Sequence, residues 1–236
     1  MKLAIVSLLA VLLPFGAGAA DVQAPKTAHP LKIGIIGTGD IGGALARHWG
    51  AAGHQLVISS RHPEQLQSLA KEIGPNVKVG TAREAAAFGE VVLISIPYGA
   101  TPQVGRDYAA ELKGKVVLDT GNPYPSRDGD MAVRDRQRGT GVASAEYLPG
   151  TRLVRAFNAI NAGPLAQEGF RKPERIGIPL ASDDAGAMKV ASQLVSDAGF
   201  DPVPVGGLSR AREFDYGTPV YVRGMTAAEL RKALRL

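Results

Sequence analysis

The chain has 236 residues, of which 45% are hydrophobic and 21% are charged, and its formal net charge is +5. This composition is that of an ordinary globular protein, and no basic run interleaved with aromatic residues indicates a nucleic-acid partner. Cysteine is absent and only four histidines occur, none at metal-ligand spacing. These counts exclude disulfides and thiolate chemistry, and they leave no expected metal site.

Residues 1–19 have the pattern of a secretory signal peptide. Lys2 precedes an apolar run over 3–13, and Ala17-Gly18-Ala19 supplies the small residues of a cleavage site. The run is about half as long as a bilayer-spanning helix requires. We therefore expect cleavage after Ala19, a loose leader over 20–30 and a periplasmic or secreted protein without a membrane span. The alternatives are an N-terminal anchor or a mis-assigned start, which would leave the protein cytoplasmic.

The first element of the folded part is a strand followed by a glycine turn and a helix. The apolar run 33–36 predicts a buried parallel strand, and the motif Gly37-x-Gly39-x-x-Gly42 leads into an amphipathic helix. Such glycines permit a tight turn, leave room for a pyrophosphate and allow the helix to pack on the strand, so the flanked motif predicts dinucleotide binding rather than an ordinary turn. The cofactor contacts predicted here are Gly37, Thr38, Gly39, Asp40, Ile41 and Gly42.

The second strand, 55–59, indicates which dinucleotide binds. An NAD-preferring site has a carboxylate at this strand end, whereas this chain has Ser59, Ser60 and Arg61. Hydroxyls and a guanidinium suit a 2′-phosphate, which favours NADP. The alternative is a polar turn in which Ser60 and Pro63 begin the next helix, and both interpretations can hold together.

The remaining patterns alternate between helices and strands. Helices are expected over 63–73, 82–88, 102–112, 143–148, 185–198 and 226–234, and strands over 77–79, 91–96, 115–119, 153–157, 175–180 and 201–205. This order predicts an α/β fold, a Rossmann-type doubly wound and mostly parallel sheet. We assign 31–157 to an NADP-binding domain and 158–236 to a small C-terminal α/β extension of the same sheet on the substrate side.

Strand ends on the carboxyl side of the sheet supply the other candidate residues. Ser95, Ile96 and Pro97 end one strand and are expected to wall the cofactor crevice. Tyr98 either faces the nicotinamide side or packs, and a rigid loop over 120–125 follows the next strand.

Two further segments allow more than one interpretation. Arg134, Arg136 and Arg138 alternate with polar residues, which favours a solvated surface over capture of an acidic substrate tail. The apolar segment 216–222 is interpreted first as core, with a substrate wall or a dimer contact as alternatives.

Several blocks together resemble the NADPH-dependent deazaflavin (coenzyme F-420) oxidoreductases and the related cytosolic domain of the six-transmembrane metalloreductases. The blocks are 35–42, Ser60-Arg61, 95–97, 119–123, 154–158, 197–203 and 207–212. The resemblance implies NADP on the glycine turn and on Ser60-Arg61, with a flavin-like ring stacked on the nicotinamide near Pro97 and Phe157-Asn158. It implies direct hydride transfer between the rings, and Asn158 and Tyr98 are the candidates for orienting the acceptor ring.

We therefore expect an NADPH-dependent oxidoreductase whose small-molecule redox partner is a flavin or deazaflavin co-substrate. One alternative is a dehydrogenase or reductase of the β-hydroxyacid or imine type, although that group relies on a large helical C-terminal domain. Another is a non-catalytic dinucleotide-binding module. A homodimer is compatible with the sequence.

Overall fold

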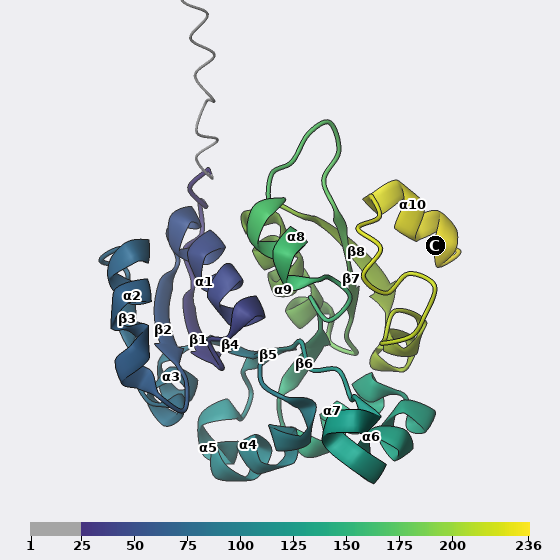
Figure 1. The fold of residues 1–236 in the computed structure, drawn as a ribbon, viewed down its shortest axis with the longest axis horizontal. Coiled ribbons are helices and arrows are strands. Elements are labelled where there is room, and N and C mark those ends of the chain that lie inside the picture. Colours follow the sequence, from purple (N-terminus) through teal and green to yellow (C-terminus); the bar gives the residue numbers. More distant parts are fainter. Residues whose placement is uncertain (1–24) are drawn as a thin grey trace, which may run out of the picture.

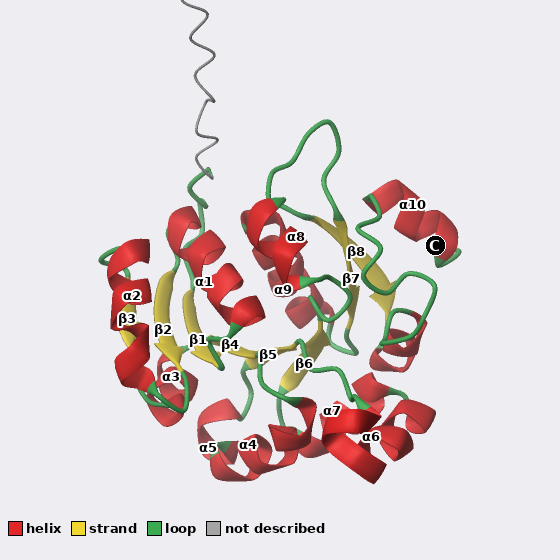
Figure 2. Ribbon diagram, in the orientation of Figure 1, coloured by secondary structure: helices red, strands yellow, loops and turns green. Residues whose placement is uncertain are grey.

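Eight strands form one sheet in the order β3-β2-β1-β4-β5-β6-β7-β8 (Figures 1 and 2). The computed structural model describes residues 25–236, so the predicted signal peptide over 1–19 and the start of the leader lie outside the described residues. The strands are β1 (Lys32–Ile36), β2 (Gln55–Ser59), β3 (Val77–Val79), β4 (Val91–Ile94), β5 (Val116–Asp119), β6 (Arg152–Arg155), β7 (Gly177–Ala181) and β8 (Asp201–Gly206). Neighbours from β3 to β6 are parallel, β7 runs antiparallel to β6, and β8 is parallel to β7. The predicted fold class, a mostly parallel Rossmann-type α/β sheet, is confirmed.

Helices cover both faces of this sheet. The α-helices are α1 (Asp40–Ala52), α2 (Gln67–Ile73), α3 (Ala82–Phe88), α4 (Thr101–Asp107), α5 (Ala109–Leu112), α6 (Pro125–Arg138), α7 (Thr140–Tyr147), α8 (Ala162–Gln167), α9 (Ala185–Asp197) and α10 (Ala227–Ala233), and the 3-10 helices are η1 (Pro63–Leu66), η2 (Tyr98–Ala100) and η3 (Leu208–Glu213). In Figure 1, α1, α8 and α9 lie on one side of the sheet and α4 to α7 on the other.

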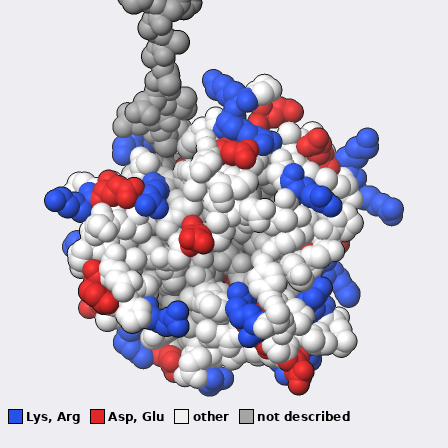
Figure 3. All heavy atoms as spheres, viewed as in Figure 1, with Lys and Arg blue, Asp and Glu red and all other residues white. Residues whose placement is uncertain are grey.

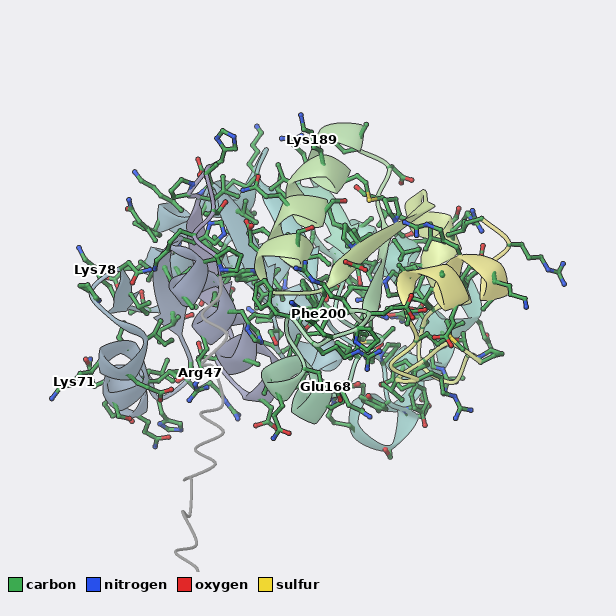
Figure 4. All side chains as sticks on the ribbon, turned by 90° about the horizontal axis from the view of Figure 1, so that it is seen from above. Arg47, Lys71, Lys78, Glu168, Lys189 and Phe200 are labelled. Atoms are coloured by element: carbon green, nitrogen blue, oxygen red, sulfur yellow. The ribbon has the colours of Figure 1, made fainter. Side chains whose placement is uncertain are left out.

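Alternation along the strands divides the core between the two faces. Ile33 and Ile35 pack with Leu45 and Trp49 of α1 on one face, whereas Ile36 belongs to a second cluster on the opposite face with α3. A third cluster joins β8 to α10 at the end of the sheet. Figure 4 shows Phe200 in the interior of the first cluster, whereas Lys71, Lys78 and Lys189 extend away from the body.

Most element boundaries differ from the predicted ones by a few residues, and the larger differences have local causes. The expected helix 63–73 begins as η1, and the expected helix 102–112 is interrupted at Tyr108, whose φ of −120° and ψ of 21° are not helical. The polar segment around 127–139 is helical as α6, but it is broken at Gly129, whose φ is 59°. The capping box of Thr81 and Glu84 is present at the start of α3.

The C-terminal part of the chain continues the sheet. β7 and β8 extend it beyond β6, and β8, which contains two prolines, occupies the sheet edge as its sequence indicates. Within residues 25–236, the helices are all too short or too polar to cross a membrane. On the face shown in Figure 3, acidic and basic side chains are interspersed without a large area of one sign.

Candidate functional site

The glycine turn lies where the chain leaves β1, at the point where the sheet order divides between β2 and β4. Ligands of doubly wound sheets bind in the crevice at this switch point. The backbone N–H groups of Gly37 and Thr38 donate to the carbonyl of Ser59 at 3.0 and 3.1 Å, and the Thr38 hydroxyl donates to the same oxygen at 3.0 Å. Three hydrogen bonds to one acceptor therefore fix the turn to the end of β2.

The three glycines of the motif have different surroundings. A Cβ on Gly37, whose φ is +97°, would lie 2.2 Å from the carbonyl oxygen of Ser95, and a Cβ on Gly42 would lie 2.1 Å from that of Gly37. A Cβ on Gly39 would meet no atom within 4 Å. Gly39 is also the N-cap of α1 and offers no side chain to its first amides. The space beside Gly39 and these free amides fit a pyrophosphate group.

The neighbouring positions of the turn are less buried. Asp40 is exposed in the first turn of α1, and Ile41 is half-buried against the core of the α1 face.

The three residues at the end of β2 have different roles: Ser59 is structural, whereas Ser60 and Arg61 are accessible. Ser59 is fully buried and its hydroxyl donates to the carbonyl of Ile35 at 2.7 Å, so it joins β2 to β1 rather than facing the crevice. The Ser60 hydroxyl accepts from the N–H of His62 at 3.1 Å. Arg61 is exposed, and no carboxylate within residues 25–236 forms an ion pair with it. Ser60 and Arg61 therefore fit a 2′-phosphate.

The exit of β4 forms the opposite wall. The N–H of Ser95 donates to the carbonyl of Ile36 at 2.9 Å, which places 95–97 against the glycine turn. Ser95 and Ile96 are half-buried, and Pro97 is exposed.

Tyr98 does not reach this crevice. Its side chain is fully buried, and its hydroxyl donates to Asp135 at 3.3 Å. Burial, followed by the carboxylates of Asp135 and Asp119, raises the pKa of Tyr98. Of the two predicted roles, the structure supports packing beneath the sheet edge, because a buried phenol held by Asp135 cannot contact a bound ring.

Asn158 lies at the end of β6, in contact with the loop after β5. It is 2% exposed, and its Nδ2 lies 3.4 Å from Oδ1 of Asn122 and 3.3 Å from Oδ1 of Asp215. Asn122 in turn donates to the carbonyl of Asn158 at 2.8 Å. The Asn158 Oδ1 is buried and has no hydrogen-bond partner among residues 25–236.

A buried charge cluster lies beneath the two asparagines. Arg155 is fully buried and donates to Asp119 at 2.8 Å and to Asp215 at 3.1 Å. Burial opposes the charge on this guanidinium, but the two carboxylates hold its pKa above the ordinary value. Asp119 also accepts from the N–H of Gly121 at 2.8 Å. The cluster joins the ends of β5 and β6 to the segment after η3.

Three tyrosines form the outer wall of this edge. The hydroxyls of Tyr124 and Tyr221 lie 2.7 Å apart, and the ring of Tyr216 meets both rings edge-on at centroid distances of 4.8 and 5.4 Å. Burial and the hydrogen bond to Tyr124 raise the pKa of Tyr221. Of the segment 216–222, only part is core: Val220 is buried, whereas Tyr216 is 36% exposed.

Sequence reasoning did not find the charge cluster or the tyrosine wall. Asp119 and Arg155 each end an apolar strand, and opposite charges at neighbouring strand ends are a usable signal for pairing. Asp215 and Tyr216 lie in a loop far along the chain and carry no such signal. In the described part of the chain, no group of three or more His, Asp or Glu residues is arranged to hold a metal ion.

The comparisons with known proteins agree with this geometry. Residues 32–123 match the family described as NADP oxidoreductase coenzyme F420-dependent. Over 217 residues the chain is 32% identical to an F420-dependent NADP reductase of Methanothermobacter marburgensis, covering 86% of this chain and 96% of that protein. It is 30% identical over 200 residues to the metalloreductase STEAP3 of Rattus norvegicus, covering 82% of this chain and 37% of that protein.

A solved structure extends the likeness to three dimensions. A hypothetical protein from Sinorhizobium meliloti has a TM-score of 0.73 at 26% identity, covering 84% of this chain and 96% of that chain. Both relationships stated from the sequence, to the deazaflavin oxidoreductases and to the metalloreductases, are confirmed. The chain belongs to the family of coenzyme F420-dependent NADP oxidoreductases and is an NADP-dependent oxidoreductase.

Proposed function

We propose that this enzyme transfers a hydride between NADP(H) and a flavin or deazaflavin acceptor. The name of the Methanothermobacter marburgensis relative, an F420-dependent NADP reductase, supports an acceptor of the deazaflavin class. The side chains gathered at the ends of β5 and β6 support it independently.

The first part of the site would hold the nucleotide. The pyrophosphate would lie on the free amides of α1 beside Gly39, and Ser60 with Arg61 would bind the 2′-phosphate. The crevice wall at 95–97 would then direct the nicotinamide toward the ends of β4 and β5. When bound, NADPH supplies the hydride.

The observation that carries the proposal is the chemical character of the acceptor side. Asn122 presents its half-buried amide there, and the nearby carboxylates of Asp119 and Asp215 are both paired with Arg155. Hydride transfer between two stacked rings requires proximity and orientation more than a titrating acid or base. The half-buried amide of Asn122, held from beneath by the buried Asn158, fits that requirement.

The C-terminal part of the chain disfavours the β-hydroxyacid and imine-type alternative. Those enzymes build the substrate pocket from a large helical domain, whereas the residues after Phe157 form β7, β8, three α-helices of 6 to 13 residues and the 3-10 helix η3.

Stopped-flow absorbance at the nicotinamide band tests the proposal. The purified enzyme is mixed with NADPH and then with a deazaflavin, FMN, a quinone or a ferric complex. We expect rapid NADPH oxidation with the flavin-type acceptors and little with the others. Tight NADPH binding without oxidation by any flavin-type acceptor would contradict the proposal and favour a non-catalytic nucleotide-binding module.

A further inference from the structure

A pocket of about 400 Å³ lies outside the nucleotide crevice, between α6 and the segment that follows η3. Figure 1 shows α6 and α7 beside the chain that leads from β8 toward α10. Its lining residues are Pro125, Val133, Arg136, Gln137, Thr140, Arg212, Asp215, Tyr216 and Thr218. A volume of this size accommodates a small polar ligand group with the chain that carries it.

The arginines around this pocket differ in whether a carboxylate neutralises them. The paired ones are Arg127 with Asp128, Arg134 with Asp135, Arg138 with Glu146 and Arg210 with Glu213. Arg136 and Arg212 both line the pocket, and within residues 25–236 neither forms an ion pair with a carboxylate. Of these six arginines, the two that line the pocket are therefore the two whose charge no carboxylate of the described residues neutralises.

Arg136 is also held in position. Its guanidinium lies over the ring of Tyr216 at 4.8 Å from the centroid, a cation–π contact that fixes the side chain while leaving its N–H donors free. A fixed guanidinium fork binds phosphate or carboxylate at a smaller entropic cost than a mobile one.

Two hydroxyls at the pocket wall are uncommitted. Thr140 is fully buried and Thr218 is half-buried, and the Oγ1 of each is buried without a hydrogen-bond partner. Buried hydroxyls without a protein partner are uncommon in native structures, so these two can take a partner from outside the chain.

One carboxylate lines the pocket but is already compensated. Asp215 accepts from Arg155 at 3.1 Å through Oδ1 and from the N–H of Thr140 at 3.3 Å through Oδ2. Its negative charge is therefore directed toward the buried cluster, and the excess charge of the pocket is the positive charge of Arg136 and Arg212.

The pocket adjoins the acceptor side of the crevice. Tyr216 lines the pocket on one side and contacts Tyr124 and Tyr221 on the other, and Tyr221 lies 3.5 Å from the amide of Asn122. A ring bound over Asn122 and Asn158 would thus have the pocket directly beyond the tyrosine wall.

We propose that Arg136 and Arg212 bind the phosphate at the end of the acceptor's side chain, so that the enzyme prefers phosphate-bearing flavins to their dephosphorylated forms. This inference rests on the proposed function. The pocket supplies affinity away from the reacting ring and therefore acts on KM more than on kcat.

FMN and riboflavin test it, because they share a ring and a ribityl chain and differ in the phosphate. At saturating NADPH, the parent enzyme is expected to have a lower KM for FMN than for riboflavin. Arg136→Gln and Arg212→Gln should each raise the KM for FMN about tenfold, as the loss of a charge-assisted hydrogen bond predicts, with kcat and the riboflavin KM unchanged. Arg138→Gln is the matched control, since it removes a charge from the same helix outside the pocket.

Competition by inorganic phosphate tests whether the pocket binds a phosphate that is part of the acceptor or only a free anion. At saturating NADPH, phosphate should compete with FMN in the parent but not in Arg136→Gln, and it should not compete with riboflavin. An FMN-to-riboflavin KM ratio that neither variant changes would overturn the inference, even if phosphate binds to the pocket. Failure of every flavin as an acceptor would instead contradict the proposed function itself.

Discussion

At the scale of single residues, the glycines of the turn differ in their role, since two allow close packing and one leaves space for a ligand. Gly37 and Gly42 lack a side chain because backbone atoms occupy the space where a Cβ would lie, whereas Gly39 borders open space. The first two are therefore required by the fold, and Gly39 is required only by what binds beside it. The sequence motif alone does not distinguish these two reasons for a glycine.

Alanine at Gly39 and at Gly42 should accordingly have different effects. Gly39→Ala is expected to leave the free energy of unfolding nearly unchanged and to weaken NADPH binding at least tenfold, because the new methyl group occupies the pyrophosphate space. Gly42→Ala should lower the free energy of unfolding by about 1–3 kcal/mol, because its methyl overlaps the carbonyl of Gly37. Urea denaturation and NADPH titration of both variants measure this. Equal stability losses would show that Gly39 is also a packing residue.

Arg61 is expected to determine the preference for NADP. Removing its exposed guanidinium should raise the KM for NADPH about tenfold and leave the KM for NADH unchanged, because only NADPH carries the 2′-phosphate. Steady-state kinetics with both cofactors check this, with Arg231→Ala on α10 as the control for loss of an exposed positive charge. A parallel change in both KM values would remove Arg61 from the 2′-phosphate site.

At the scale of elements, Arg155 joins three segments that are distant in the sequence. It belongs to β6, Asp119 ends β5 and Asp215 follows η3, so one side chain joins the ends of β5 and β6 to the segment after η3. Arg152, on the same strand, pairs with Asp184 at the surface instead, where water screens the interaction.

Replacing each of these two arginines compares how much a buried and a surface ion pair contribute to the free energy of unfolding. Arg155→Met should lower the free energy of unfolding by about 3–5 kcal/mol, because it leaves two carboxylates buried and close together. Arg152→Met should have a much smaller effect. Urea denaturation monitored by circular dichroism measures both, and comparable losses would show that the buried cluster has no special role in stability.

The elements themselves were largely predictable, whereas their contacts were not. Local signals identified β2 and α3 at their observed bounds and the end of α9 to within one residue. These signals act within a few residues. The burial of Tyr98 depends on its contact with Asp135. Arg134 and Arg138 pair with carboxylates and Arg136 pairs with none among residues 25–236, because the fold decides which acidic side chains lie near each arginine. Neither is encoded in local spacing.

At the scale of the whole molecule, Trp49 of α1 and His54, two residues after the end of that helix, connect the two parts of the chain. The indole of Trp49 donates to the carbonyl of Leu194 at 2.8 Å. His54 is fully buried, its Nδ1 accepts from the N–H of Leu31 at 3.0 Å, and its Nε2 lies 3.1 Å from Asp197. The nucleotide-binding part and the C-terminal extension therefore share one interior, and a change at His54 is expected to affect the stability of the whole chain.

His54 should make this stability dependent on pH. Burial lowers its pKa from the usual 6.5, although Asp197 opposes the shift, and the Nδ1 that would take the proton already accepts from Leu31. The unfolded chain therefore binds a proton first as pH falls, so the stability that His54 contributes is present above pH 6.5 and is lost below it.

His54→Gln tests this directly. At about pH 8 the variant should be less stable by about 1–3 kcal/mol, because the partly buried N–H of Leu31 loses its acceptor. The difference between the parent and the variant should narrow toward about pH 5, since only the parent loses the His54 contribution there. The pKa of His48 is also lowered, mainly by burial, but His48 is present in both proteins, so its titration cancels in the comparison. Urea denaturation across this pH range gives the two curves. A difference that stays constant would show that folding leaves the pKa of His54 unchanged, and one that widens as pH falls would show that folding raises it.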